Sequence, residues 1–318
     1  MVRLSGRPAS WLSALLAALV LSACGGGGDD NNSSLSQQSA EAGGIRQSNV
    51  QQSASDPSKD SIDWFNLRRQ QAGLAILERN NLIDKAAQGH SDYQKTNDVV
   101  THTQTRGKPG FTGETLSDRI KNAGYQFSSS SGLAYGEVIA GTSNPSGAEA
   151  AEDLITAIYH RFVIFEPRFK EIGSGTAVAG DGMSYFTTNF AANGLDVGLA
   201  SGQVVVYPVP DQQRVTRIFF SDNEAPDPVP DRNEVGYPIS VHANITSTVT
   251  VQSFTVRPRG GAVLAVRLLT RATDAQTPAS VAAIVPLAPL TAGATYDVQF
   301  SGLVDGIRVD RSWSFTVS

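Results

Sequence analysis

The sequence predicts a chain of two folded units, an α+β unit over residues 61–195 and an all-β sandwich over residues 203–318. Apolar residues recur at helical spacing through the first unit, which then closes in two strand-like runs. From Gly202 onward the apolar runs are short and separated by turn residues, the pattern of a β-sandwich. A length of 318 residues also suits two domains of roughly 150 residues each.

The first 24 residues have the features of an export signal. Arg3 and Arg7 precede the uncharged run Trp11–Ala23, which is shorter than the ~20 residues of a membrane-spanning helix. The run ends in Leu21-Ser22-Ala23-Cys24, and Cys24 is the single cysteine of the chain. This ending resembles the lipobox of bacterial lipoproteins, which implies a signal peptide over 1–23 and lipidation of Cys24 by palmitate and other acyl chains. The alternative is an ordinary small-residue cleavage site with an incidental cysteine.

Residues 24–60 are expected to form a disordered tether. The segment begins with four glycines after Cys24, continues in Asp, Asn, Ser and Gln, and contains no aromatic residue. Such a composition buries too little apolar surface to offset the entropy lost on ordering.

Four helices are predicted in the first unit. Asp60 or Ser61 is expected to cap the first helix, and the second covers 81–97 with His90 on its apolar stripe as a core residue. The third spans 115–122, and the fourth begins at Ser146 and runs towards His160. Two strands, 172–179 and 184–191, flank the turn sequence Ala179-Gly180-Asp181-Gly182, which predicts a hairpin.

Eight strands are predicted in the second unit. Tyr296, Val298 and Phe300 share one face of a strand, as do Trp313 and Phe315, so these faces are expected to form the sandwich core. His242 lies in a strand with no acidic residue nearby in the sequence. The expected strands are 204–207, 215–220, 239–243, 249–256, 263–269, 281–285, 296–300 and 313–317.

Composition excludes several function classes. The chain has 25 basic and 30 acidic residues, whereas a nucleic-acid-binding domain normally has a basic surface, so no nucleic-acid partner is expected. The sequence contains no Gly-x-Ser-x-Gly nucleophile elbow, and the glycines after Cys24 lack the flanking residues of a phosphate loop.

A series of short motifs in the first unit resembles the CAP superfamily, also called the cysteine-rich secretory, antigen 5 and pathogenesis-related or SCP-like family. Each motif is weak alone, but their order and spacing match the family. The motifs are Asn66–Leu74, Thr101-His102, Arg119-Ile120, Ala123-Gly124-Tyr125, Gly136–Ala140, Tyr159-His160-Arg161, Pro167, Phe169, Glu171–Gly175 and the strand ending in Phe190.

The resemblance implies an α-β-α sandwich with a cleft lined by two histidines and one or two glutamates. Matching the motifs assigns the histidines to His102 and His160 and the first glutamate to Glu137. In relatives this cleft can hold a divalent metal, often zinc. Here Val138 replaces the asparagine that follows the glutamate in the family motif, which removes one hydrogen bond that could support Glu137.

Two chemical roles remain open for His102, Glu137 and His160. Two imidazoles and a carboxylate can bind a divalent metal, or a His–Glu pair can move protons near neutral pH. Alternatively, His160 interacts as a cation with the carbonyls at a helix C-terminus, and His102 is a loop histidine paired with a carboxylate. Glu114 is the further candidate for the cluster, although a helix-capping role also suits its position.

The second unit resembles the bacterial Ig-like modules of cell-surface proteins through 290–300, Asp305-Gly306 and 313–317. The sequence as a whole therefore favours a lipid-anchored protein of the bacterial cell envelope, in the outer rather than the inner membrane because Gly25, not aspartate, follows Cys24. The expected role is non-enzymatic binding or scaffolding, with a small apolar, lipid, polysaccharide or peptidoglycan-derived ligand in the cleft. The alternatives are a metal-dependent hydrolase acting on envelope material and a purely structural surface module.

Overall fold

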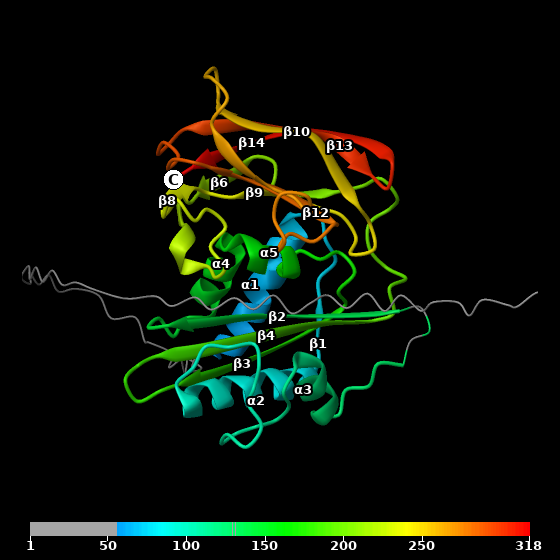
Figure 1. Cartoon of the computed structure of the whole chain (residues 1–318), viewed down its shortest axis with the longest axis vertical. Coiled ribbons are helices and arrows are strands. Elements are labelled where there is room, and N and C mark those ends of the chain that lie inside the picture. Colours follow the sequence, from blue (N-terminus) through cyan, green and yellow to red (C-terminus); the bar gives the residue numbers. More distant parts are fainter. Residues whose placement is uncertain (1–55, 129, 131) are drawn as a thin grey trace, which may run out of the picture.

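The computed structural model describes residues 56–128, 130 and 132–318. Figure 1 shows five layers stacked along the long axis of the molecule: two β-sheets, a layer of helices, a third main sheet and a second layer of helices. The signal peptide, Cys24 and all but the end of the predicted tether lie outside the described residues. No helix in the described part of the chain is long and apolar enough to span a membrane.

The N-terminal unit is an α-β-α sandwich, as expected. Its sheet has the strand order β1-β3-β4-β2. Helices α2 and α3 cover one face, and α1, α4 and α5 lie over the other (Figure 1). The elements are α1 (Pro57–Gln71), β1 (Glu78–Arg79), α2 (Asn81–Asn97), α3 (Leu116–Asn122), β2 (Leu133–Thr142), α4 (Gly147–Thr156), α5 (Ile158–Ile164), β3 (Glu171–Val178) and β4 (Ser184–Asn193).

Helix α1 begins earlier than the predicted cap. The Asp56 side chain accepts a hydrogen bond from the Ser58 backbone, and Pro57 occupies the first helical turn. Proline favours this position because its φ angle suits a helix and it has no N–H to leave unpaired. The predicted tether boundary at residue 60 is therefore wrong, since residues 57–60 are helical.

A break at Ala157 divides the predicted fourth helix. Ser146 caps α4 as expected, but Ala157 adopts extended backbone angles of φ −66° and ψ 118°, and α5 begins at Ile158. His160 thus lies in the first turn of α5. The alternative that placed it among helix C-terminal carbonyls is wrong.

The C-terminal unit is all-β and consistent with an Ig-like sandwich. One sheet has the order β11-β12-β9-β5 and the other β10-β13-β14-β6, with most neighbours antiparallel. If β5 and β9–β14 are lettered A–G in chain order, the sheets become D-E-B-A and C-F-G, the order of an immunoglobulin constant-type domain, with β6 added in parallel beside strand G. The strands are β5 (Val205–Tyr207), β6 (Gln212–Val215), β9 (Ile239–His242), β10 (Val249–Pro258), β11 (Val266–Leu269), β12 (Val281–Pro286), β13 (Thr295–Val304) and β14 (Ile307–Val317).

An insertion between β6 and β9 departs from the expected strands. The predicted strand 215–220 is divided between β6 and β7 (Ile218–Phe220), and β7 pairs with the unexpected β8 (Glu234–Gly236). A short 3-10 helix, η1 (Ser221–Asn223), connects β7 to the loop that leads to β8. We call residues 216–237 the insertion.

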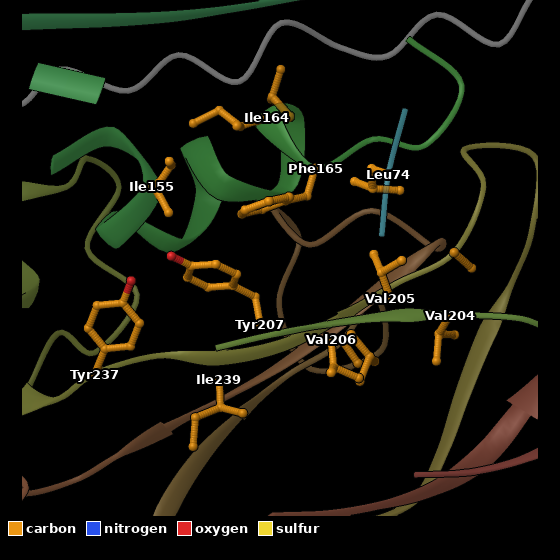
Figure 2. Packing of buried hydrophobic residues seen from close by; sticks show 14 of the residues in the cluster. Leu74, Ile155, Ile164, Phe165, Val204, Val205, Val206, Tyr207, Tyr237 and Ile239 are labelled. Atoms are coloured by element: carbon orange, nitrogen blue, oxygen red, sulfur yellow. The ribbon is translucent and has the colours of Figure 1, made fainter. Parts of the chain in front are cut away.

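The hydrophobic core continues from one unit into the other. Figure 2 shows Ile155 of α4 and Phe165, which directly follows α5, facing Tyr207 of the sandwich, and these residues belong to one buried cluster. The two units therefore share a core across the 195–203 boundary.

Candidate functional site

His102 and Glu137 come together in a buried group completed by Arg119. His102 lies in the loop before α3, Arg119 on α3 and Glu137 on β2. His102 Nδ1 lies 2.8 Å from Glu137 Oε1, and Arg119 Nη2 donates to Oε1 at 2.8 Å and to Oε2 at 2.6 Å. All three side chains are at most 2% exposed. The charge of Glu137 is therefore balanced inside the protein by a guanidinium.

The surroundings keep Glu137 ionised. Burial by itself raises the pKa of Glu137, but the Arg119 charge, the nearby His90 and the His102 hydrogen bond together hold this pKa well below its usual range. His90 donates from Nε2 to the Thr101 carbonyl and accepts at Nδ1 from the Gln104 amide. Burial lowers the pKa of His90 to about 4, so it is the neutral core residue that its position on the helix predicts.

His160 pairs with a carboxylate from the other unit. Its Nδ1 lies 3.1 Å from Oε1 of Glu224, which directly follows η1 in the insertion. Glu224 is 1% exposed and also accepts hydrogen bonds from three backbone N–H groups of the first turn of α5. Those donors belong to Ile158, Tyr159 and His160, at 2.8, 2.7 and 3.2 Å. One carboxylate thus caps α5 and orients the imidazole.

A cavity of about 420 Å³ lies where the insertion meets the N-terminal unit. His160 lines it, together with the end of β2, one side of α4 and the β7–η1 segment. His102 and Glu137 are not among its lining residues. The lining residues are Ile139, Ala140, Gly141, Thr142, Ala150, Glu152, Asp153, Leu154, Thr156, Ala157, His160, Thr216, Ile218, Phe219, Phe220 and Asn223.

The sequence-predicted residues differ in their hydrogen-bond partners and in whether they line the cavity. His102 and Glu137 are in contact, whereas His160 binds Glu224 and faces the cavity. Glu114 joins neither group. Its side chain is exposed, and Thr115 rather than Glu114 caps α3.

The hydrogen-bond partners of Glu137 compete with any metal ion for its carboxylate. Glu137 is already engaged by Arg119 and His102, and Arg119 places a positive charge where a cation would bind. Within residues 56–128, 130 and 132–318, no group of three or more His, Cys, Asp or Glu side chains is arranged to hold a metal.

Sequence reasoning missed two partners, Arg119 and Glu224. A signal existed for Arg119, because it belongs to one of the motifs that carry the family resemblance. No local signal existed for Glu224, which lies 64 residues from His160 in an extended proline-containing segment.

Comparison with known families supports the resemblance on which these assignments rest. Residues 62–190 match the sequence model of the CAP family, described as the cysteine-rich secretory protein family. These residues form a CAP domain. A search of curated proteins found no match.

Solved structures similar to the chain include three proteins with low sequence identity. An extracellular protein containing an SCP domain from Bacillus anthracis str. Ames is 24% identical over 48% of this chain, with a TM-score of 0.36, and the match spans only 45% of that protein. An outer surface protein from Borrelia burgdorferi is 18% identical over 43% of this chain and 95% of its own, with a TM-score of 0.36. A venom allergen-like protein from Schistosoma mansoni is 14% identical over 44% and 90%, with a TM-score of 0.31.

The CAP domain of this chain holds Glu137 in place although residue 138 departs from the family motif. Val138, which stands in place of asparagine, is fully buried in the core. Arg119, which belongs to one of the family motifs, donates two hydrogen bonds to Glu137. The carboxylate is therefore held in place without the asparagine.

Proposed function

We propose that this protein is a lipid-anchored component of the bacterial cell envelope, in the outer membrane, and that it binds a small ligand without converting it chemically. The lipobox at Cys24 and Gly25 after it support the location. Several acyl chains on one residue anchor a protein firmly, because each buried CH₂ contributes ~0.8 kcal/mol.

The observation that carries the binding role is the cavity at the CAP domain. Apolar side chains from both units line it, including Leu154, Ile218 and Phe219, and the few polar groups include His160. A concave, largely apolar site with a few oriented polar groups is typical of small-molecule binding.

Binding without chemical conversion is favoured because His102 and Glu137, two residues that catalysis would need, are already hydrogen-bonded to each other. Glu137 is neutralised by Arg119 and is not a lining residue of the cavity. Hydrolysis by the metal-dependent alternative needs a ligand set for a metal-bound water, and the described residues do not offer one.

Filling the mouth of the cavity tests this function. Thr216 is exposed and lines the cavity, so Thr216→Trp introduces bulk there without disturbing the core. Native mass spectrometry of the protein isolated from its own envelope should show a non-covalent small-molecule adduct, and its abundance should fall at least tenfold in Thr216→Trp.

Arg217→Trp is the matched control, because Arg217 is the exposed neighbour of Thr216 and does not line the cavity. This variant should keep the adduct of the wild type. A wild-type protein without an adduct would instead support the purely structural alternative.

A further inference from the structure

The cavity offers hydrogen-bond acceptors and negative charge, and His160 is the basic side chain among its lining residues. Its lining contains Glu152 and Asp153 on α4 and three threonines, and it contains neither lysine nor arginine. Most of the remaining wall is aliphatic or aromatic. A ligand with an anionic head group would find no lysine or arginine to pair with on this wall.

The two lining carboxylates differ in their partners. Glu152 accepts from Trp64 Nε1 at 2.7 Å and from Arg68 Nε at 3.0 Å, so its charge is already compensated. Asp153 forms no side-chain hydrogen bond or ion pair with any residue that the structure describes. Partial burial raises the pKa of Asp153, and the neighbouring Glu149 and Glu152 add to this effect. Asp153, which is exposed, thus presents a negative charge that is not paired with any cationic side chain among the described residues.

His160 adds a second acceptor to the same cavity. Because the Glu224 carboxylate accepts, Nδ1 of His160 carries a proton, and an imidazole in this tautomer has the lone pair of Nε2 as an acceptor. Within the described part of the chain, this Nε2 is buried and has no hydrogen-bond partner. A buried acceptor without a partner is costly unless a bound donor satisfies it.

We propose that the cavity binds a small molecule that combines an apolar body with a protonated amine. The ammonium group approaches Asp153 and donates to His160 Nε2, while the apolar body packs on Leu154, Ile218 and Phe219. This inference rests on the proposed binding function and adds the chemical class of its ligand. It also gives the C-terminal unit a role in recognition, because the insertion supplies one wall of the cavity and the carboxylate that orients His160.

Three probes with one apolar body and different head groups test this class. They are 3-phenylpropylamine, 3-phenylpropanol and 3-phenylpropanoate, titrated calorimetrically into the full chain in phospholipid nanodiscs, with empty nanodiscs as the blank. The amine should bind about fivefold more tightly than the alcohol, as expected for a partly exposed ion pair, and the carboxylate should bind most weakly. Asp153→Asn should remove the advantage of the amine and leave the affinity for the alcohol unchanged.

Glu149→Gln is the matched control, because Glu149 is an acid on the same helix that does not line the cavity. It should keep the preference of the wild type. Equal affinity for the three probes, tighter binding of the carboxylate, or no binding of any probe would overturn the amine class. The adduct experiment with Thr216→Trp judges the binding function separately, so that function can survive the failure of the ligand class.

Discussion

Buried charges in this protein are held in two different ways. Arg119 and Glu137 neutralise each other, whereas Arg161 is fully buried and donates to backbone carbonyls, including that of Pro238 at 2.6 Å. The Arg161 guanidinium also lies 5.0 and 4.8 Å from the ring centroids of Tyr207 and Tyr237. Because Arg161 is on α5, Tyr207 is on the sandwich and Tyr237 ends the insertion, this cation is part of the contact between the units.

Glu166 is a buried carboxylate with a different balance. It accepts from the backbone N–H of Arg168 and of Ile245, both at 3.0 Å, so it bridges the CAP domain and the sandwich. Burial raises the pKa of Glu166 from 4.5 to about 7, although these hydrogen bonds and the charges of Arg69 and Arg168 oppose the rise. The folded protein therefore favours the protonated side chain.

This shift predicts a loss of stability as the pH rises. The folded pKa lies above the unfolded value, so the contribution of Glu166 is complete below pH 4.5 and is lost as the pH passes through about 7. The loss should be on the order of 3 kcal/mol in the free energy of unfolding, measured by urea denaturation at pH 4 to 8. Glu166→Gln keeps an acceptor oxygen and should remove this part of the pH dependence.

The difference between the pH profiles of stability of the wild type and of Glu166→Gln isolates the contribution of Glu166. His90 and His242, with pKa values lowered to about 4 and about 3 by burial, destabilise both proteins equally as the pH falls. Parallel pH profiles for wild type and Glu166→Gln would show that Glu166 ionises normally in the folded state.

At the scale of elements, the most important feature is the break between helices α4 and α5. It creates a helix N-terminus inside the molecule, where unpaired backbone N–H groups are costly. None of the CAP-domain side chains that the structure describes caps α5. Glu224 of the insertion pairs with these donors, so an element of the sandwich completes a helix of the CAP domain.

Removing this carboxylate should destabilise α5 and release His160. Glu224→Ala leaves three buried N–H donors and His160 Nδ1 without an acceptor, so the free energy of unfolding should fall by roughly 3 kcal/mol. The NMR signal of the proton on His160 Nδ1 should also no longer be that of a hydrogen-bonded proton. Thermal or urea denaturation and imidazole NMR measure the two effects.

Asp222→Ala is the control, since Asp222 is an exposed acid on η1. It should change stability by less than about 0.5 kcal/mol, as surface substitutions usually do. An unaltered His160 signal in Glu224→Ala would contradict the proposed role of Glu224.

At the scale of the whole molecule, the sandwich packs on the helical layer formed by α1, α4 and α5. The sheet containing β9 and β12 lies over α1, α4 and α5, on the side opposite the CAP sheet (Figure 1). Leu74 and Phe165 of the CAP domain and Val205 and Tyr207 of the sandwich belong to the same buried cluster (Figure 2). Residues of both units line the cavity, so both determine its shape.

The predicted lipid anchor at Cys24 is expected to hold this protein at the membrane. Cys24→Ser removes the thiol that the acyl chains require, so the protein should leave the membrane fraction or remain unprocessed. Fractionation of cells followed by mass determination measures both outcomes. Ser36→Ala in the tether should leave the distribution unchanged, and normal processing with unchanged membrane partitioning of Cys24→Ser would exclude the lipid anchor.

Much of the architecture could be predicted because it depends on local patterns. The apolar period identified α2 and the stripe of α4, the turn sequence at residues 179–182 located the hairpin of β3 and β4, and alternation identified the buried faces of β13 and β14. The CAP motifs located His102 and Glu137, which are in contact. The break at Ala157 could not be predicted, because Thr156 to Phe162 is compatible with a continuous helix.

The sequence by itself thus determined the CAP domain, the all-β unit after it and the candidate histidines. Only the tertiary structure decided that His160 pairs with Glu224, that Arg119 neutralises Glu137 and that a cavity lies between the CAP domain and the insertion. The physical reason is the distance along the sequence between the residues that interact. Helices and strands follow from residues within a few positions of one another, whereas His160 and Glu224 are 64 residues apart and meet because the two units bury a common apolar surface.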